Sequence, residues 1–374
     1  MNRVITTPVG IRGHIAWRAY DRRGRPTPVR ARDARGRERF IAGGAQSNLI
    51  TDNGMNAIAG SWVLGRGIWE TDTTSAQTAN WRRFARFGTG SAAPSFTDTT
   101  LDNQVLASVT SGAFTGFAIE GTGTANDTWT ARYMYRRLAE AADAVNLTEF
   151  GLSWSESDSD LAVRELFRDE FGDPITLQLP AGAFIRLDHW LELQLDLSEN
   201  TGTLQLEEFD IFGDLVTTHN IDYAVKLYAR TSGADSDVSK TRHLTHALRS
   251  VGTISTPIGT GNAVLRAPEV NPALPDSFAG ALVPSGWGGT GSSGFTADHP
   301  EYVAGSHEIV RRFVLDPAIQ NGAWYGYGKS YNGFYDGFTN IGGGLLIAFR
   351  NGDSHTKAST HALTWEHRLS WARA

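Results

Sequence analysis

Residues 185–197 alternate between apolar and polar side chains, and this pattern constrains the fold more than any other feature of the chain. Six of the odd positions carry leucine or isoleucine, whereas most even positions carry charged or amide side chains. A period of two is the period of a β-strand with one buried face and one solvated face. Only His189 and Trp190 interrupt it. The segment therefore predicts a long strand that lines a hydrophobic core on one side.

Residues 128–137 alternate in the same way. Trp129, Ala131, Tyr133 and Tyr135 share one face, so we expect that face to be buried in the core or against another subunit, and the opposite face to be solvated. Shorter strands are expected at residues 14–20, 105–117, 146–154, 161–168, 175–179, 224–230, 243–251, 345–350 and 361–371.

The composition agrees with many short strands. Glycine accounts for 41 of 374 residues, where about 7% is usual. Aromatic and Val/Thr-rich segments accompany it, and together they favour strands joined by tight turns over helical bundles. Strands spaced in this way are typical of sandwich and jelly-roll architectures. We therefore predict an all-β fold with β-sandwich or jelly-roll-like lobes.

One short helix is expected near residues 52–64. Thr51 or Asp52 can cap its N-terminus, and Met55 and Ile58 recur near helical spacing. Glycines within the segment lower its helix propensity.

Three regions are expected along the chain. Residues 1–45 form a basic N-terminal arm or hairpin that serves as a docking element. Residues 46–225 form a β-sandwich lobe, and residues 226–374 form a C-terminal β region packed with that lobe. The acidic stretch 198–225 is interpreted as a connector between two β lobes.

The N-terminal arm carries ten arginines between positions 12 and 39, against three acids. One interpretation is a nucleic-acid-binding arm, and the other is a solvated hairpin that docks on an acidic neighbour. We favour the second, because the whole chain has a net charge of -6 and the arm contains strand-like apolar residues. The candidate docking residues are Arg18, Arg22, Arg23, Arg25 and Arg30.

Residues 324–338 combine aromatic side chains with glycines. Aromatic rings on glycine-rich loops can stack on sugars, and their rigidity keeps the entropic cost of binding low. The same rings could pack in a subunit interface or fill a small core, and we favour that interpretation. The candidate recognition or interface residues are Trp324, Tyr325, Tyr327, Tyr331, Phe334 and Tyr335.

Metal-binding patterns are weak. Histidines gather in two segments, at His243 and His246 and at His355, His361 and His367. On strands, the first pair would point to opposite faces, and residues of the second group that share a face would lie roughly 20 Å apart. We expect surface or inter-subunit histidines in the second group. Residues 158–160 and 235–237 resemble calcium loops without the glycine and distal glutamate. No metal or cofactor is expected.

Catalytic patterns are also weak. The chain has no cysteine, which excludes disulfides, cysteine-bound zinc and a cysteine nucleophile. Residues 88–90 lack the residues that complete a phosphate loop. Carboxylates that could hydrolyse glycans in pairs are present at Glu149, Glu156, Asp169, Glu170 and Asp188. A protein of this size always offers such pairs, so we expect no enzyme.

Membrane insertion is not expected. No apolar run approaches the roughly 18 residues that span a bilayer, and the first residues lack the apolar core of a signal peptide.

An ordered set of short motifs runs from residue 48 to residue 182. Asn48 to Gly54 has the form Asn-Leu-hydrophobic-Thr-x-x-Gly and leads into the expected helix. The later members are Gly88-Thr89-Gly90, Ala93-Pro94, Asp98-Thr99-Thr100-Leu101, Leu147-Thr148-Glu149-Phe150-Gly151-Leu152 and Pro180-Ala181-Gly182. As an ordered set over about residues 45–197, they resemble a family of phage tail and virion structural proteins.

The resemblance implies a structural component of a tailed-phage virion, such as a tail, baseplate, fibre-attachment or collar protein. Such a protein is made in the host cytoplasm and resides in the virion. It would bind copies of itself, as a ring or trimer, and other virion proteins, with nucleic acid not expected as a partner. One alternative is a host-receptor or carbohydrate-binding module at the tail tip. A second alternative is a glycan-degrading tail enzyme.

Overall fold

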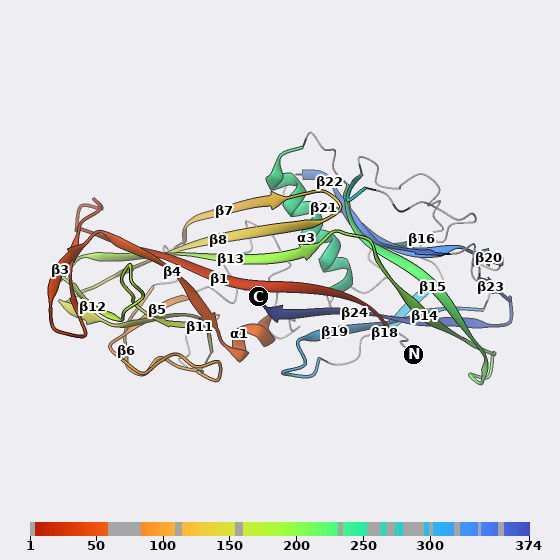
Figure 1. The fold of residues 1–374 in the computed structure, drawn as a ribbon, viewed down its shortest axis with the longest axis horizontal. Helices are drawn as coiled ribbons and strands as arrows, with labels where there is room; N and C mark the ends of the chain where they lie inside the picture. The colour runs from red at the N-terminus through yellow and green to blue at the C-terminus, as the bar shows by residue number, and fades with distance from the viewer. Residues whose placement is uncertain are drawn as a thin grey trace.

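The computed structural model describes residues 4–58, 84–108, 114–153, 160–230, 235–252, 263–266, 274, 276–279, 295–298, 302–317, 322–335, 338–350 and 355–374. Strands dominate this part of the chain, which also contains two helices (Figure 1). The predicted all-β fold is therefore confirmed. Neither helix is long and apolar enough to cross a membrane within the described residues.

The elements follow in chain order. The N-terminal strands are β1 (Val4–Tyr20), β2 (Val29–Asp33), β3 (Glu38–Ile41), β4 (Gly43–Ile50), β5 (Phe84–Gly88), β6 (Gln104–Ala107) and β7 (Phe114–Gly123). The central strands are β8 (Thr128–Glu140), β9 (Val145–Leu147), β10 (Glu149–Ser153), β11 (Leu161–Leu166), β12 (Ile175–Leu179), β13 (Phe184–Asp196), β14 (Asn200–Phe209) and β15 (Leu215–Arg230).

The C-terminal strands are β16 (Ala263–Arg266), β17 (Phe278–Ala279), β18 (Phe295–Asp298), β19 (Glu308–Leu315), β20 (Gly322–Trp324), β21 (Gly326–Tyr335), β22 (Phe338–Phe349), β23 (His355–Lys357) and β24 (Ala362–Arg373). The helices are α1 (Asp52–Ala57) and α3 (Asp237–Gly252).

Strand β1 runs along much of the elongated molecule (Figure 1). It pairs antiparallel with β13 and β4 and parallel with β24. Strand β4 also pairs with β11 through its last two residues, so it joins the β1 sheet to the ladder β11–β10–β5–β6. At the other end, β24 pairs with β14 and β19. Backbone ladders therefore join strands from all three regions expected from the sequence.

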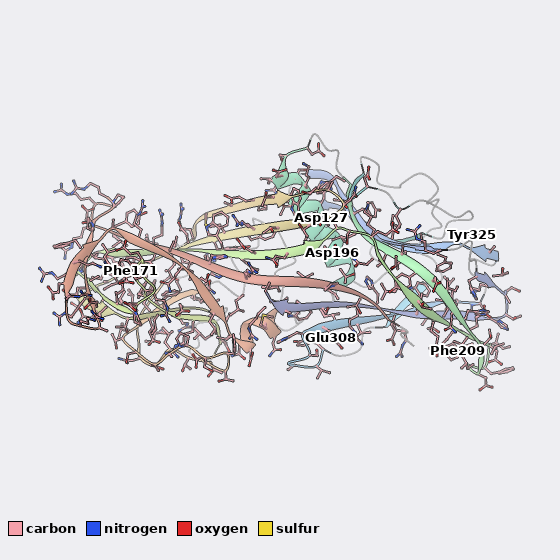
Figure 2. All side chains as sticks on the ribbon, in the orientation of Figure 1. Asp127, Phe171, Asp196, Phe209, Glu308 and Tyr325 are labelled. Carbon is pink, nitrogen blue, oxygen red and sulfur yellow. The ribbon has the colours of Figure 1, made fainter. Side chains whose placement is uncertain are left out.

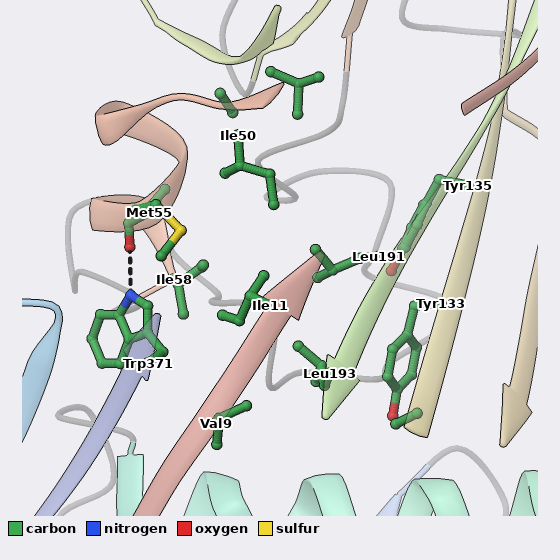
Figure 3. Close-up of a cluster of buried hydrophobic side chains, with 14 of the residues drawn as sticks. Val9, Ile11, Ile50, Met55, Ile58, Tyr133, Tyr135, Leu191, Leu193 and Trp371 are labelled. Carbon is green, nitrogen blue, oxygen red and sulfur yellow. Dashed lines mark hydrogen bonds between the residues drawn. The ribbon is translucent and has the colours of Figure 1, made fainter. Parts of the chain in front are cut away.

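The apolar faces of both predicted alternations are confirmed, whereas Met134, on the face of β8 that was expected to be solvated, is buried. Every leucine and isoleucine at an odd position from 185 to 197 is at most 2% exposed, and His189 is buried on the same face. On β8, the aromatic face of residues 129–135 is equally buried. Figure 3 shows side chains of β1, β8 and β13 meeting those of α1 and β24 in the core. The opposite face of β13 is less solvated than expected, because two arginines of the adjacent strand β8 pair with Asp188 and Glu192 and cover them.

The helical prediction needed one correction. Thr51 caps α1 as expected, accepting a hydrogen bond from the backbone N–H of Gly54 at 3.1 Å, and residues 59–64 lie outside the described part. Residues 243–251, however, belong to α3 and are not a strand. Leu244, Leu248 and Val251 recur three to four residues apart, which is the period of a helix.

The interpretation of residues 198–225 as a connector is wrong. They form most of the β14–β15 hairpin, with paired residues from Asn200 to Val225. Leu204 and Leu206 are fully buried and alternate with half-buried polar side chains. The high charge of the segment concealed this period of two.

Four hairpin turns share a five-residue sequence, Asp-x-x-Gly-x. In each, the aspartate Oδ1 accepts N–H groups from the residues two and four positions later, at 2.8–3.0 Å. The glycine has φ between 72° and 85°, a conformation that side chains disfavour. The turns are Asp21–Arg25, Asp33–Arg37, Asp169–Asp173 and Asp210–Asp214.

Candidate functional site

The motif segments of residues 88–101 and 147–152 meet at a buried carboxylate, Glu149. This side chain is 0% exposed. Its Oε1 accepts hydrogen bonds from the backbone N–H groups of Gly90 and Asn103, at 3.0 and 3.1 Å. Its Oε2 accepts two from Arg164, at 3.0 and 3.1 Å. Glu149 thus organises the loop that follows β5.

Arg164 binds the same loop from the opposite direction. The guanidinium is 2% exposed and also contacts Asp98 at 2.6 Å and Asp102 at 2.9 Å. Burial alone would lower the pKa of Arg164, but the hydrogen bonds to Asp98 and Glu149 raise that pKa above its usual value. The arginine therefore remains charged and neutralises part of a group of three carboxylates.

The Gly-Thr-Gly motif is explained by close approach to Glu149. A Cβ atom on either Gly88 or Gly90 would lie 2.4 Å from the Glu149 Oε1. Such a separation is far below van der Waals contact, so both positions require glycine for the loop to reach the carboxylate.

The Asn48–Gly54 motif and Met55, the residue after it, contact the neighbouring strands β11 and β24. Thr51 Oγ1 donates a hydrogen bond to the carbonyl of Leu161 at 2.6 Å. From β24, Trp371 donates to the Met55 carbonyl at 2.9 Å, which Figure 3 shows as a dashed line. Arg373 pairs with Asp52 at 2.7 Å. The motif therefore ties the C-terminal strand to the first lobe.

The candidate docking arginines do not form a free arm, because β1 is a central strand. Arg18 lies exposed on β1. Arg22 and Arg23 are exposed in the turn after β1, where Arg22 donates to the carbonyl of Ala181 at 3.2 Å. Arg25 pairs with Asp21 in the same turn, and Arg30 on β2 pairs with Glu38 at 3.3 Å.

Five of the six candidate aromatic residues lie on two strands. Trp324 ends β20, which pairs with β23, and Tyr325 follows it as a half-buried residue. Tyr327, Tyr331, Phe334 and Tyr335 lie on β21, which pairs with β22 and β16. The side chains of the residues on β20 and β21 lie outside the described part, so their role in recognition stays a prediction.

The carboxylates considered for hydrolysis are held by different arginines. Glu149 pairs with Arg164, Asp169 and Glu170 pair with Arg39, and Asp188 pairs with Arg136 at 2.7 Å. Glu156 lies outside the described residues, as do residues 158 and 159.

The expectation of surface or inter-subunit histidines at the C-terminal end is wrong for two of them, because both are buried within the chain itself. His355 is 2% exposed and His367 is 3% exposed. His367 Nε2 lies 3.1 Å from the Thr7 hydroxyl. His243 and His246 lie on α3, not on a strand.

His355 belongs to a group that the sequence did not reveal. Its Nε2 lies 2.9 Å from Glu208 Oε1, and His361 Nδ1 lies 3.1 Å from Glu208 Oε2. His219 Nε2 lies 3.8 Å from Glu208 Oε2. Burial and the neighbouring His219 lower the pKa of His355, against the opposing effect of Glu208. One buried carboxylate therefore faces three imidazoles.

Comparisons of the chain with models of known protein families, with curated proteins and with solved structures found no match.

Proposed function

We propose that the protein is a structural component of a tailed-phage virion, of the tail or its appendages, that acts by assembling with copies of itself and other virion proteins. The observation that carries the proposal is the role of the motifs that resemble this family. Their glycines and acids surround the buried Glu149–Arg164 pair, and their threonine caps α1. The motif residues therefore stabilise the fold of the chain, and this supports a structural role.

The opposite charges of the two ends of the molecule support assembly. We define the basic end as residues 21–41 together with the turn at 169–173, and the acidic tip as residues 207–216. The two lie at opposite ends of the long axis (Figures 1 and 2). Residues 21–41 carry eight arginines and three acids. The turn at 169–173 adds three more acids, so the basic end as a whole has two more positive than negative charges. The acidic tip carries four acids and no lysine or arginine.

Both ends also expose large apolar side chains. Phe171 and Phe40 at the basic end are 78% and 70% exposed. Phe212 and Ile211 at the acidic tip are 83% and 68% exposed. Contiguous exposed apolar patches mark contact surfaces, and we propose that the two side chains at each end form part of one. The occupant that fits is a second copy of the chain, whose acidic tip meets the basic end of its neighbour.

A contact of this kind is head-to-tail. Heterologous contacts close into a ring when the rotation between neighbours permits, and otherwise extend into a filament. A ring agrees with the oligomer expected from the family resemblance. The opposite charges would set the orientation of neighbours, and the phenylalanines would supply the apolar contact.

Two experiments test the proposal. Mass spectrometry of purified particles should detect this chain, and its absence from them would refute a virion role.

Sedimentation velocity should show oligomers of the wild type whose population rises with concentration. Phe212→Ser should reduce the association, whereas Val303→Ser, a change at a 69% exposed valine on neither end, should leave it unaltered. Equal association of both variants would refute the head-to-tail contact.

A further inference from the structure

We infer that Glu208, His219 and His355 form a binding site for a borderline transition-metal ion such as Zn²⁺, at the base of the acidic tip. The inference does not depend on the proposed function. Glu208 lies near the end of β14, His219 lies on β15 and His355 begins β23. The ligands therefore come from three separate strands, and a bound ion would connect them.

Strand register places the first two ligands together. Leu206 is opposite His219, and Glu208 is opposite Thr217 in the antiparallel β14–β15 ladder. Glu208 and His219 are therefore diagonal neighbours on one face of the sheet, at a spacing that long side chains can bridge. The turn before β24 and the short strand β23 supply His361 and His355 over the same face.

The donor atoms converge on one point. A carboxylate oxygen of Glu208 and one ring nitrogen each of His219 and His355 all lie within 4.8 Å of one another. In a tetrahedral zinc site, ligand atoms lie about 2.0–2.1 Å from the ion, and so roughly 3.3 Å apart. Glu208 Oε1 lies 2.9 Å from His355 Nε2, and Glu208 Oε2 lies 3.8 Å from His219 Nε2. One distance is shorter than that separation and the other is longer.

An unsatisfied nitrogen independently indicates a ligand. The His219 Nε2 atom is buried and has no hydrogen-bond partner within the described part of the chain. It points toward Glu208 from beyond hydrogen-bonding distance. Buried polar atoms nearly always have a partner, and a metal ion between His219 and Glu208 would supply one.

The ligand set selects the class of metal. Two imidazoles and one carboxylate suit Zn²⁺ and neighbouring divalent transition metals, and this combination occurs in zinc sites. Ca²⁺ and Mg²⁺ prefer sites built from oxygen ligands. His361 Nδ1, 3.1 Å from Glu208 Oε2, would orient the carboxylate in the way that outer-shell groups orient metal ligands.

The test uses the untagged full-length chain after treatment with a chelator. Isothermal titration with Zn²⁺ should show one saturable site per chain, and Co²⁺ should give visible absorption bands of a tetrahedral site. His355→Gln and His219→Gln should each weaken Zn²⁺ binding at least about tenfold. His219→Gln is informative even if His355→Gln fails to fold, because the His219 side chain is 40% exposed.

A matched control is available at His14. Its side chain is also 40% exposed, and it also lies beside a buried glutamate, Glu192, at 3.4 Å. His14→Gln should leave Zn²⁺ affinity unaltered. The inference is overturned if the wild type shows no saturable binding of Zn²⁺ or Co²⁺. It is equally overturned if His219→Gln binds Zn²⁺ as tightly as His14→Gln does.

Discussion

Arg164 donates two hydrogen bonds to the same oxygen of Glu149: its Nε and Nη2 lie 3.1 and 3.0 Å from Oε2. This geometry leaves Oε1 free to accept the backbone N–H groups of Gly90 and Asn103. The carboxylate therefore divides its hydrogen bonds between a charged side chain and a loop. Because both partners are buried, removing one leaves the other charge without solvent or a full set of partners.

Replacing Glu149 should be strongly destabilising. We expect Glu149→Ala to lower the free energy of unfolding by about 3–5 kcal/mol, since it breaks a buried pair and leaves loop N–H groups unsatisfied. Urea denaturation measures the change. The control is Glu38→Ala, which removes an exposed glutamate paired with Arg32 at 2.6 Å. A Glu149→Ala variant as stable as this control would contradict the assigned role.

The sequence predicts the strands of this site but not its chemistry. Alternation locates β8 and β13, and the capping threonine locates the start of α1, because both signals are local. In the sequence, Glu149 stood out as a carboxylate considered for hydrolysis and as a member of the motif at residues 147–152, and neither observation indicated its partner. Its partner Arg164 lies across the antiparallel pairing of β10 and β11, where Arg164 is opposite Gly151. That contact depends on register, which no local pattern determines.

The group around Glu208 is still less accessible to sequence reasoning. Its ligands span positions 208 to 355, and no two of them share a strand. The spacing rules for metal ligands operate within one strand or helix, so they could not combine His355 with Glu208. The α3 segment was misread for a different reason, because its histidines and hydroxyl residues masked a helical period.

The hydrogen bond from Trp371 to Met55 should contribute measurably to stability. Trp371→Phe leaves the Met55 carbonyl without its indole donor, and Trp371 is only 3% exposed. Trp17 is a matched control, because it is 2% exposed and its buried Nε1 has no partner within the described residues. We expect Trp371→Phe to cost about 1–3 kcal/mol more than Trp17→Phe. Equal losses in urea denaturation would contradict this contribution.

Asp196 should make stability depend on acidic pH. Burial raises the pKa of Asp196, but hydrogen bonds from Ser198 and Asn200 outweigh it, so the net shift lowers this pKa from its usual value of 3.8. A depressed folded pKa stabilises the fold above the unfolded pKa, and that contribution disappears as pH falls through the folded value. The stability difference between wild type and Asp196→Ala should therefore shrink below about pH 4. An identical difference at pH 3 and pH 6 would contradict the assignment.

The aromatic strands allow a direct test of receptor binding. If Trp324 and Tyr327 stack on host glycans, then Trp324→Ala and Tyr327→Ala should each weaken adsorption to host cells and binding on a glycan array. Phe96→Ala is the control, because Phe96 is a 48% exposed aromatic residue that lies on neither β20 nor β21. Unchanged binding by both aromatic variants would contradict a role in receptor binding and would indicate that the rings pack in the core or in a subunit interface.

Association between the basic end and the acidic tip should respond to salt. Attraction between exposed charges is screened over about 10 Å at 0.1 M ionic strength and over about 3 Å at 1 M. Sedimentation velocity at these two ionic strengths should therefore show fewer oligomers in high salt. Arg23→Glu, a change at an exposed turn position, should weaken association at low salt and remove much of the salt dependence. Association that does not weaken with salt would instead indicate contact through the phenylalanines alone, because salt screens charges and does not screen apolar burial.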